Sequence, residues 1–163
     1  MCNELLEKYE DVDLINAYDY NIKACTDCGF CSKHACECIY CDMDEIYKLI
    51  EEAANIIIVS PIHVGSVSAP LLAMFSRLQI YFANKFILKN NYPFAKKQGF
   101  GIIVSGKDWD GQRSGAKVVL KHALLEMNAN FNYYCYLTNT DSKGDYSSQL
   151  NGFYQEVDKY VRG

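Results

Sequence analysis

The chain has 163 residues, of which 50% are hydrophobic and 22% charged, and its formal net charge is −4. This length suits a single domain over residues 1–163 that can bury a core, and the composition excludes a disordered chain or a collagen-like repeat. The mild acidity argues against nucleic acid as a partner, because nucleic-acid binding proteins usually carry a basic excess.

The predicted elements alternate between strands and helices along the chain. Apolar spacing predicts a short helix at the N-terminus, and a capping-box pattern at 42–45 predicts the start of a second helix. Strands are expected at Asp11–Tyr18, Asn55–Ser60, Gly99–Ser105 and Phe131–Leu137, and further helices at Leu71–Phe82, Ala116–Met127 and Tyr146–Val161.

One uncharged stretch, residues 53–76, is long enough to raise the question of a membrane helix. Pro61, Gly65 and Pro70 interrupt it, which favours a strand, a loop and a helix instead. The N-terminus has no basic segment followed by an apolar one, so we expect no signal peptide, no membrane partner and a cytoplasmic location.

Alternating strands and long helices predict an α/β fold with a doubly wound parallel sheet in three layers, α/β/α. The two most apolar strands, Asn55–Ser60 and Gly99–Ser105, look like strands buried on both faces. Ligands of such sheets bind beyond the carboxyl ends of the strands. We therefore expect the loops that follow these two strands, at 60–69 and 105–111, to form a binding site.

Six of the eight cysteines lie between residues 25 and 41, within a cysteine-rich insertion at 24–41. Thiolates two residues apart can converge on one metal centre, and Gly29 would permit the tight turn this needs. The spacing fits an iron–sulfur cluster better than zinc, although zinc with His34 as a further ligand stays open. We predict Cys25, Cys28, Cys31 and Cys36 as ligands, with Cys38 and Cys41 as alternatives for the fourth.

The motif Cys25-TDCGFC31, followed by Asn55-IIIVSPIHVGSVSAPLLAMFSR77, resembles the iron–sulfur flavoprotein branch of the NADPH-dependent FMN reductase family. The resemblance covers about residues 5–137 and implies a flavodoxin-like fold, bound FMN and, in some members, a [4Fe-4S] cluster. It places two loops against the flavin, and Trp109 in the second could stack on the ring or cover it. The implied FMN-binding residues are Pro61, Ile62, His63, Val64, Gly65, Ser66, Ser105, Gly106, Trp109 and Gly111.

The chain departs from the family at its start, where members have a strand that ends in a loop for the FMN phosphate. No segment here matches that strand, so we expect the sheet to lack its first strand and the neighbouring edges to be unpaired or rearranged. Either the start of the chain is truncated, or other means, such as pairing with a second chain, fill the gap. His63 is a second departure, because the family often has an aromatic residue there.

Flavins carry their own reactivity, so no catalytic residue is predicted. The leading hypothesis is an FMN-dependent electron-transfer protein or NAD(P)H:acceptor oxidoreductase with an iron–sulfur cluster. Its partners would be a ferredoxin-like carrier or NAD(P)H, and a small-molecule acceptor. The alternative is a non-catalytic flavodoxin-like remnant, or a zinc-stapled module, that has lost FMN. The aromatic stretch at 81–94 could serve as the interface of a homodimer or homotetramer.

Overall fold

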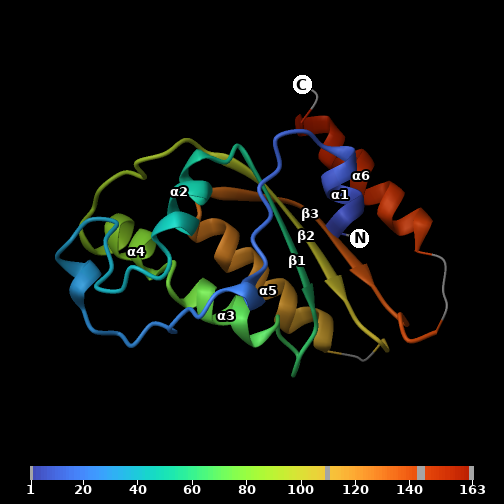
Figure 1. Cartoon of the computed structure of the whole chain (residues 1–163), viewed down its shortest axis with the longest axis horizontal. Helices are drawn as coiled ribbons and strands as arrows, with labels where there is room; N and C mark the ends of the chain where they lie inside the picture. The colour runs from blue at the N-terminus through green and yellow to red at the C-terminus, as the bar shows by residue number, and fades with distance from the viewer. Residues whose placement is uncertain (1, 109–110, 143–145, 162–163) are drawn as a thin grey trace.

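The computed structural model describes residues 2–108, 111–142 and 146–161. Its helices and strands follow the alternation expected from the sequence (Figure 1). Two one-turn 3₁₀ helices, Ala17–Asp19 and Phe30–Ser32, and a short π-helix, Ala83–Ile87, lie between them. The main elements are α1 (Cys2–Lys8), α2 (Asp44–Glu52), β1 (Asn55–Pro61), α3 (Ala69–Ser76), α4 (Gln79–Phe82), β2 (Lys97–Val104), α5 (Gln112–Glu126), β3 (Ala129–Leu137) and α6 (Ser147–Val161).

The three strands of the described residues form one parallel sheet in the order β1-β2-β3. Ile58 of β1 pairs with Gly101 of β2, and Ile102 of β2 pairs with Cys135 of β3. The register between β2 and β3 shifts once, between Gly99 and Phe100. All carboxyl ends of the strands therefore lie at one edge of the sheet, where the two predicted ligand loops begin.

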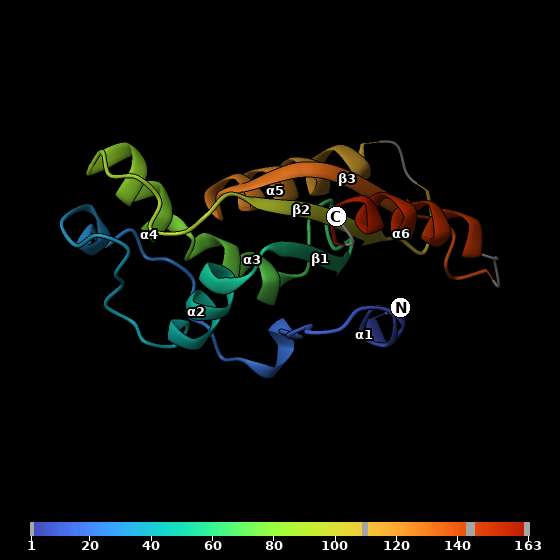
Figure 2. The same ribbon diagram turned by 90° about the horizontal axis from the view of Figure 1, so that it is seen from above.

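Helices cover both faces of the sheet, as the three-layer prediction requires (Figure 2). One apolar cluster joins α2, α3, α4 and α5 to the sheet and includes Ile58 and Leu120. A second joins α1 and α6 to the opposite face through Leu5, Phe100 and Phe153. This arrangement confirms the α/β flavodoxin-like fold class. None of the described helices is long and apolar enough to cross a membrane.

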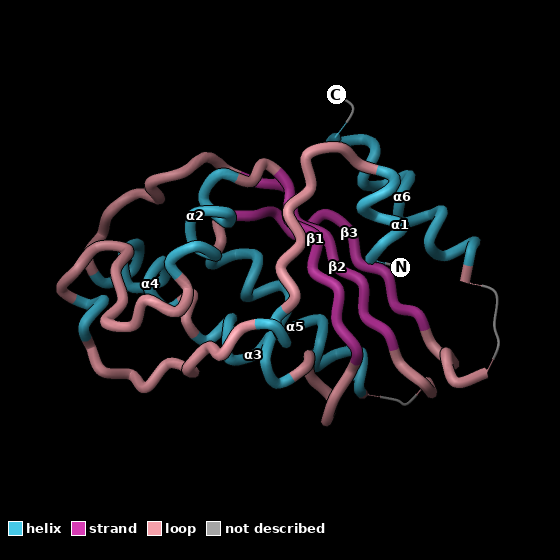
Figure 3. The backbone as a smooth tube through the Cα atoms, in the orientation of Figure 1, coloured by secondary structure: helices cyan, strands magenta, loops and turns pink. Residues whose placement is uncertain are grey.

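The predicted strand Asp11–Tyr18 is wrong, because this segment is an irregular coil that ends in the turn Ala17–Asp19 (Figure 3). Its alternation of polar and apolar residues is genuine, but a strand also needs a neighbour for its backbone hydrogen bonds. No described strand lies beside it, and Val12 and Leu14 are 43% and 56% exposed. The segment therefore crosses the surface without joining the sheet.

The expected single helix Leu71–Phe82 is divided into α3 and α4 at Arg77 and Leu78. Tighter hydrogen bonds mark the break, since the N–H groups of Arg77 and Leu78 donate to Met74 and Phe75 at 3.1 and 3.0 Å. This break leaves Arg77 at the end of α3, beside the cysteine-rich insertion.

Candidate functional site

The cysteine-rich insertion, residues 24–41, forms an extended loop beside α4, which we call the cysteine loop (Figure 1). Gly29 has a φ of 73°, in the left-handed region that glycine adopts readily, and it starts the turn Phe30–Ser32. The ring of Phe30 stacks on His34 with centroids 3.9 Å apart. The expected turn at Gly29 is thus confirmed, and it separates Cys28 from Cys31.

Four cysteines of this loop, Cys25, Cys28, Cys31 and Cys38, line one small recess, which we call the cysteine recess. Arg77 forms part of its wall. Burial raises the pKa of the Cys31 thiol, and the neighbouring thiols of Cys25, Cys38 and Cys28 raise it further. The thiols are therefore close enough to disfavour one another's ionisation, which a bound cation would reverse.

Cys36 does not line this recess. Burial raises the pKa of its thiol, followed by the negative charge of Glu51 on α2. Cys36 also contributes to the raised pKa values of Tyr81 and Tyr92. Three of the four predicted ligands thus line one recess together with Cys38, and Cys36 is not part of its wall.

Every cysteine whose side chain the structure describes is a free thiol, and Cys41 is exposed. Among the described residues, no group of three or more histidine, cysteine, aspartate or glutamate side chains is already gathered for one metal ion.

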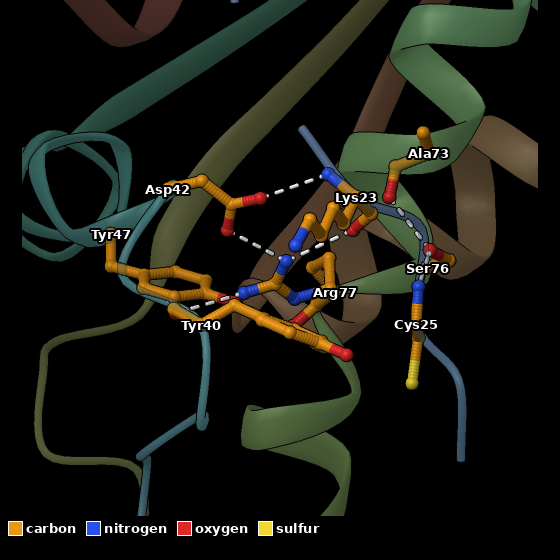
Figure 4. Close-up of polar contacts among 8 residues, drawn as sticks. All are labelled: Lys23, Cys25, Tyr40, Asp42, Tyr47, Ala73, Ser76 and Arg77. Atoms are coloured by element: carbon orange, nitrogen blue, oxygen red, sulfur yellow. Dashed lines mark hydrogen bonds and ion pairs between the residues drawn. The ribbon is translucent and has the colours of Figure 1, made fainter. Parts of the chain in front are cut away.

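A buried ion pair lies beside the cysteine loop (Figure 4). Arg77 Nη1 lies 2.8 Å from Asp42 Oδ1, and the Arg77 side chain is only 1% exposed. Burial opposes ionisation of Asp42, but hydrogen bonds from the Lys23 N–H and from Arg77 outweigh it and lower the pKa of this carboxyl group. Asp42 therefore does not cap α2 as the capping-box pattern predicted, and Met43 precedes the helix instead.

Sequence reasoning missed the roles of Arg77 and Asp42. Arg77 is the first charged residue after the uncharged stretch 53–76. A charged residue directly after such an apolar stretch indicates a buried cation, and a buried cation needs a hydrogen-bonded or oppositely charged partner.

The loop after β1 continues the strand and then turns back on itself. Ile62 N–H donates to the Val104 carbonyl at 2.8 Å. His63 and Ser66 exchange two backbone hydrogen bonds of 2.9 Å around Val64 and Gly65, whose φ values are 51° and 72°. Two positive φ values define a tight turn of the type found in hairpins. The Val64 side chain at its tip is fully exposed.

The loop after β2 lies next to the end of β3. Ser105 N–H donates to the Leu137 carbonyl at 2.8 Å, and the Ser105 hydroxyl donates to the carbonyl of Lys107. Gly111 has a φ of 86° and precedes α5. Trp109 lies outside the described residues. A cavity of about 500 Å³ opens between this loop and the segment after β3, and it is lined by Gly106, Lys107, Asp108, Asn139, Asp141 and Ser142.

The start of α5 holds the first of these loops in place. A Cβ atom at Gly115 would overlap the carbonyl oxygen of Gly65, so only glycine allows this close approach. The expected loops after β1 and β2 thus lie at the same edge of the sheet, as predicted. The cavity is formed by the loop after β2 and the segment after β3, and within the described chain none of residues 61–66 lines it.

These features define a class: an α/β protein with a parallel sheet, ligand-type loops at the carboxyl edge and a separate loop rich in free thiols. The model of the NADPH-dependent FMN reductase family matches residues 1–137. The chain belongs to that family.

Three relatives are named iron–sulfur flavoproteins. The protein from Archaeoglobus fulgidus is 31% identical over 106 residues, and the match covers 64% of this chain and 51% of the relative's length. The protein from Methanosarcina thermophila is 31% identical over 106 residues, and the match covers 65% of this chain and 52% of the relative's length. A protein from Methanocaldococcus jannaschii is 33% identical over 132 residues, and the match covers 78% of this chain and 65% of the relative's length. The chain thus spans about half the length of the first two relatives.

Proposed function

We propose that this chain is part of an FMN-dependent electron-transfer protein or NAD(P)H:acceptor oxidoreductase whose cysteine loop holds a [4Fe-4S] cluster. The observation that carries the proposal is the cysteine recess, which Cys25, Cys28, Cys31 and Cys38 line within the fold of a flavin reductase family. Relatives with the name iron–sulfur flavoprotein support it.

Four thiolates are the usual ligand set of such a cluster, and the recess supplies four. Three of them, Cys25, Cys28 and Cys31, agree with the sequence prediction. For the fourth ligand the recess favours Cys38 over Cys36, because Cys38 lines it and Cys36 does not. None of the described residues that line the recess is a histidine, so its lining favours a thiolate-bound group.

We propose that the FMN ring binds at the edge of the sheet formed by Pro61–Ser66, Ser105 and Gly106. Gly111 and Trp109 of the second loop complete this proposed binding site. The exposed Val64 side chain offers an apolar surface at this edge, and the close contact between Gly65 and Gly115 fixes the turn. When bound, FMN exchanges one or two electrons and so can couple a two-electron donor to one-electron carriers. The residues of the chain bind and orient it.

The donor in this proposal is NAD(P)H or a ferredoxin-like carrier, and the acceptor is a small molecule. We also propose that the active form is a homodimer or homotetramer in a reducing compartment. The exposed Phe82, Phe86 and Ile87 form an apolar patch on the stretch expected to be an interface.

The proposal is tested by the anaerobic absorbance spectrum of the full chain after incubation with iron, sulfide and FMN. We expect flavin peaks together with a broad shoulder and about four iron atoms per chain. A colourless protein that holds zinc, or nothing, would contradict the proposal and favour the remnant or the zinc-stapled module. A brown protein that releases all FMN on gel filtration would contradict the flavin part alone.

A further inference from the structure

Both ends of the cysteine loop meet at one side chain, the guanidinium of Arg77 (Figure 4). At the entry, Nη1 donates to the Lys23 carbonyl at 2.9 Å. At the exit, Nη2 donates to the Tyr40 carbonyl at 3.0 Å. We call Lys23, Tyr40 and Asp42 the stem of the loop. One planar group with several fixed donors can join two backbone segments in this way, which a lysine cannot.

The two sides of the stem are also hydrogen-bonded directly to each other. The carboxylate of Asp42 accepts the backbone N–H of Lys23 at 2.8 Å while its other oxygen binds Arg77. One step further along, the N–H of Cys25 donates to the hydroxyl of Ser76 at 2.9 Å. The first cysteine of the recess is therefore fixed to the end of α3 by its own backbone.

Both the backbone and the side chain of Arg77 are held in place by their surroundings. Its side chain is 1% exposed, and the hydroxyl of Tyr47 on α2 donates to the Arg77 carbonyl at 2.9 Å. The ring of Tyr40 lies over the guanidinium at 5.2 Å. Among the described residues, the buried Nε of Arg77 has no hydrogen-bond partner. Arg77 thus brings a fixed positive charge and an unused donor to the wall of the cysteine recess.

We propose that Arg77 is the positioning residue of the cysteine loop: it closes the stem and shapes the recess before any cluster binds, and its charge then acts on the group in the recess. The first part is independent of the proposed function, and the second part rests on it. A positive charge beside a cluster favours the reduced form and raises the reduction potential.

The first part is tested on the full chain without iron, by hydrogen exchange with mass spectrometry. We expect the stem amides of Lys23 and Cys25 to exchange at least about tenfold faster in Arg77→Lys, since charge-assisted hydrogen bonds are lost. The amides of β2 should keep their rates. Arg113→Lys, the same substitution at an exposed site on α5, is the matched control and should leave the stem unchanged. Equal stem exchange in wild type and Arg77→Lys would overturn the proposal.

If Arg77→Lys does not fold, Asp42→Asn decides the same question. It removes the carboxylate charge but leaves the two carbonyl contacts of Arg77. Because Asp42 itself accepts the Lys23 N–H, the amide to follow is that of Cys25, whose acceptor is the Ser76 hydroxyl, and we expect a smaller acceleration there. Unchanged exchange in this variant would also overturn the proposal.

The second part is tested on chain loaded with iron and sulfide, by the midpoint potential of the cluster. We expect Arg77→Gln to lower the potential and Arg77→Lys, which keeps the charge, to lower it less. Equal potentials in all three proteins would overturn this part. A wild-type chain that takes up no iron contradicts the proposed function, whereas the exchange result on the iron-free chain still decides the role of Arg77 in the stem.

Discussion

Asp42 and Arg77 form a charge pair in which one partner is almost completely buried, with side chains 25% and 1% exposed. Such a pair gains little over an apolar core, but loss of one partner leaves an unpaired buried charge. The sequence showed Asp42 as part of a capping-box pattern. The pattern failed because the carboxylate has stronger partners in Arg77 and in the Lys23 N–H, and these come from distant segments.

We predict that Asp42→Ala lowers the free energy of unfolding by about 3 kcal/mol, because it leaves the Arg77 guanidinium buried and unpaired. Urea denaturation of the iron-free chain measures this. Asp44→Ala, two positions along and exposed in the first turn of α2, is the control and should cost about 0.5 kcal/mol. Equal losses in the two variants would contradict the role assigned to the pair.

A second residue-scale prediction concerns Glu126 at the end of α5, where burial raises the pKa of the carboxyl group. The folded state therefore holds the proton more tightly than the unfolded state, and stability is lost as pH rises from the unfolded pKa towards the folded one. We expect Glu126→Gln to gain stability over wild type as pH rises above about 4, the ordinary range of glutamate. Thermal unfolding at several pH values tests this, with the exposed Glu10→Gln as control. A difference that does not vary with pH would contradict it.

At the scale of elements, the helix α5 and the turn after β1 are fitted to one another through backbone contact. Gly115 has no side chain because the Gly65 carbonyl occupies that space, whereas a Cβ at Gly152 in α6 would meet nothing within 4 Å. The sequence predicted both the loop and the helix, but it could not reveal this contact, since 50 residues separate the two glycines.

We predict that Gly115→Ala lowers the free energy of unfolding by about 1–3 kcal/mol through overpacking, and weakens FMN binding by displacing the turn. Gly152→Ala, the same exchange in open space within a helix, should stabilise by about 0.5–1 kcal/mol. Chemical denaturation and flavin fluorescence titration measure the two effects. Stabilisation by Gly115→Ala would show that the turn is free to move away from α5.

For the whole molecule, the main structural feature is that one side of β1 forms an edge of the sheet without a neighbouring strand among the described residues. In a parallel sheet, the backbone N–H and C=O groups of alternate residues point to the same neighbouring strand. Ala54 and Ile62, at the two ends of β1, both bond to the β2 segment. Ile57 and Val59 are out of phase with them, so their backbone groups point away from β2. No described strand pairs there. The sequence predicted a sheet whose edges beside the expected gap are unpaired or rearranged, and among the described residues the β1 edge is unpaired.

The sequence predicted the strands β1, β2 and β3 and the helices on both faces, because continuous apolar runs and helical spacing are local signals. It failed at Asp11–Tyr18, where a local alternation lacks a neighbouring strand. The site was predicted in part: the cysteine cluster stands out by composition, but the spacing could not decide between Cys36 and Cys38. The recess that distinguishes them also takes wall residues from a distant segment, among them Arg77.

The central claim is that the cysteine recess binds a cluster through Cys25, Cys28, Cys31 and Cys38. It is tested most directly by iron and sulfide content after anaerobic reconstitution of wild type, Cys38→Ser and Cys36→Ser. We expect about four irons per chain in wild type and in Cys36→Ser, and a loss of most of the iron in Cys38→Ser. Full iron content in Cys38→Ser together with loss in Cys36→Ser would contradict the assignment, and no iron in any of the three would contradict the cluster itself.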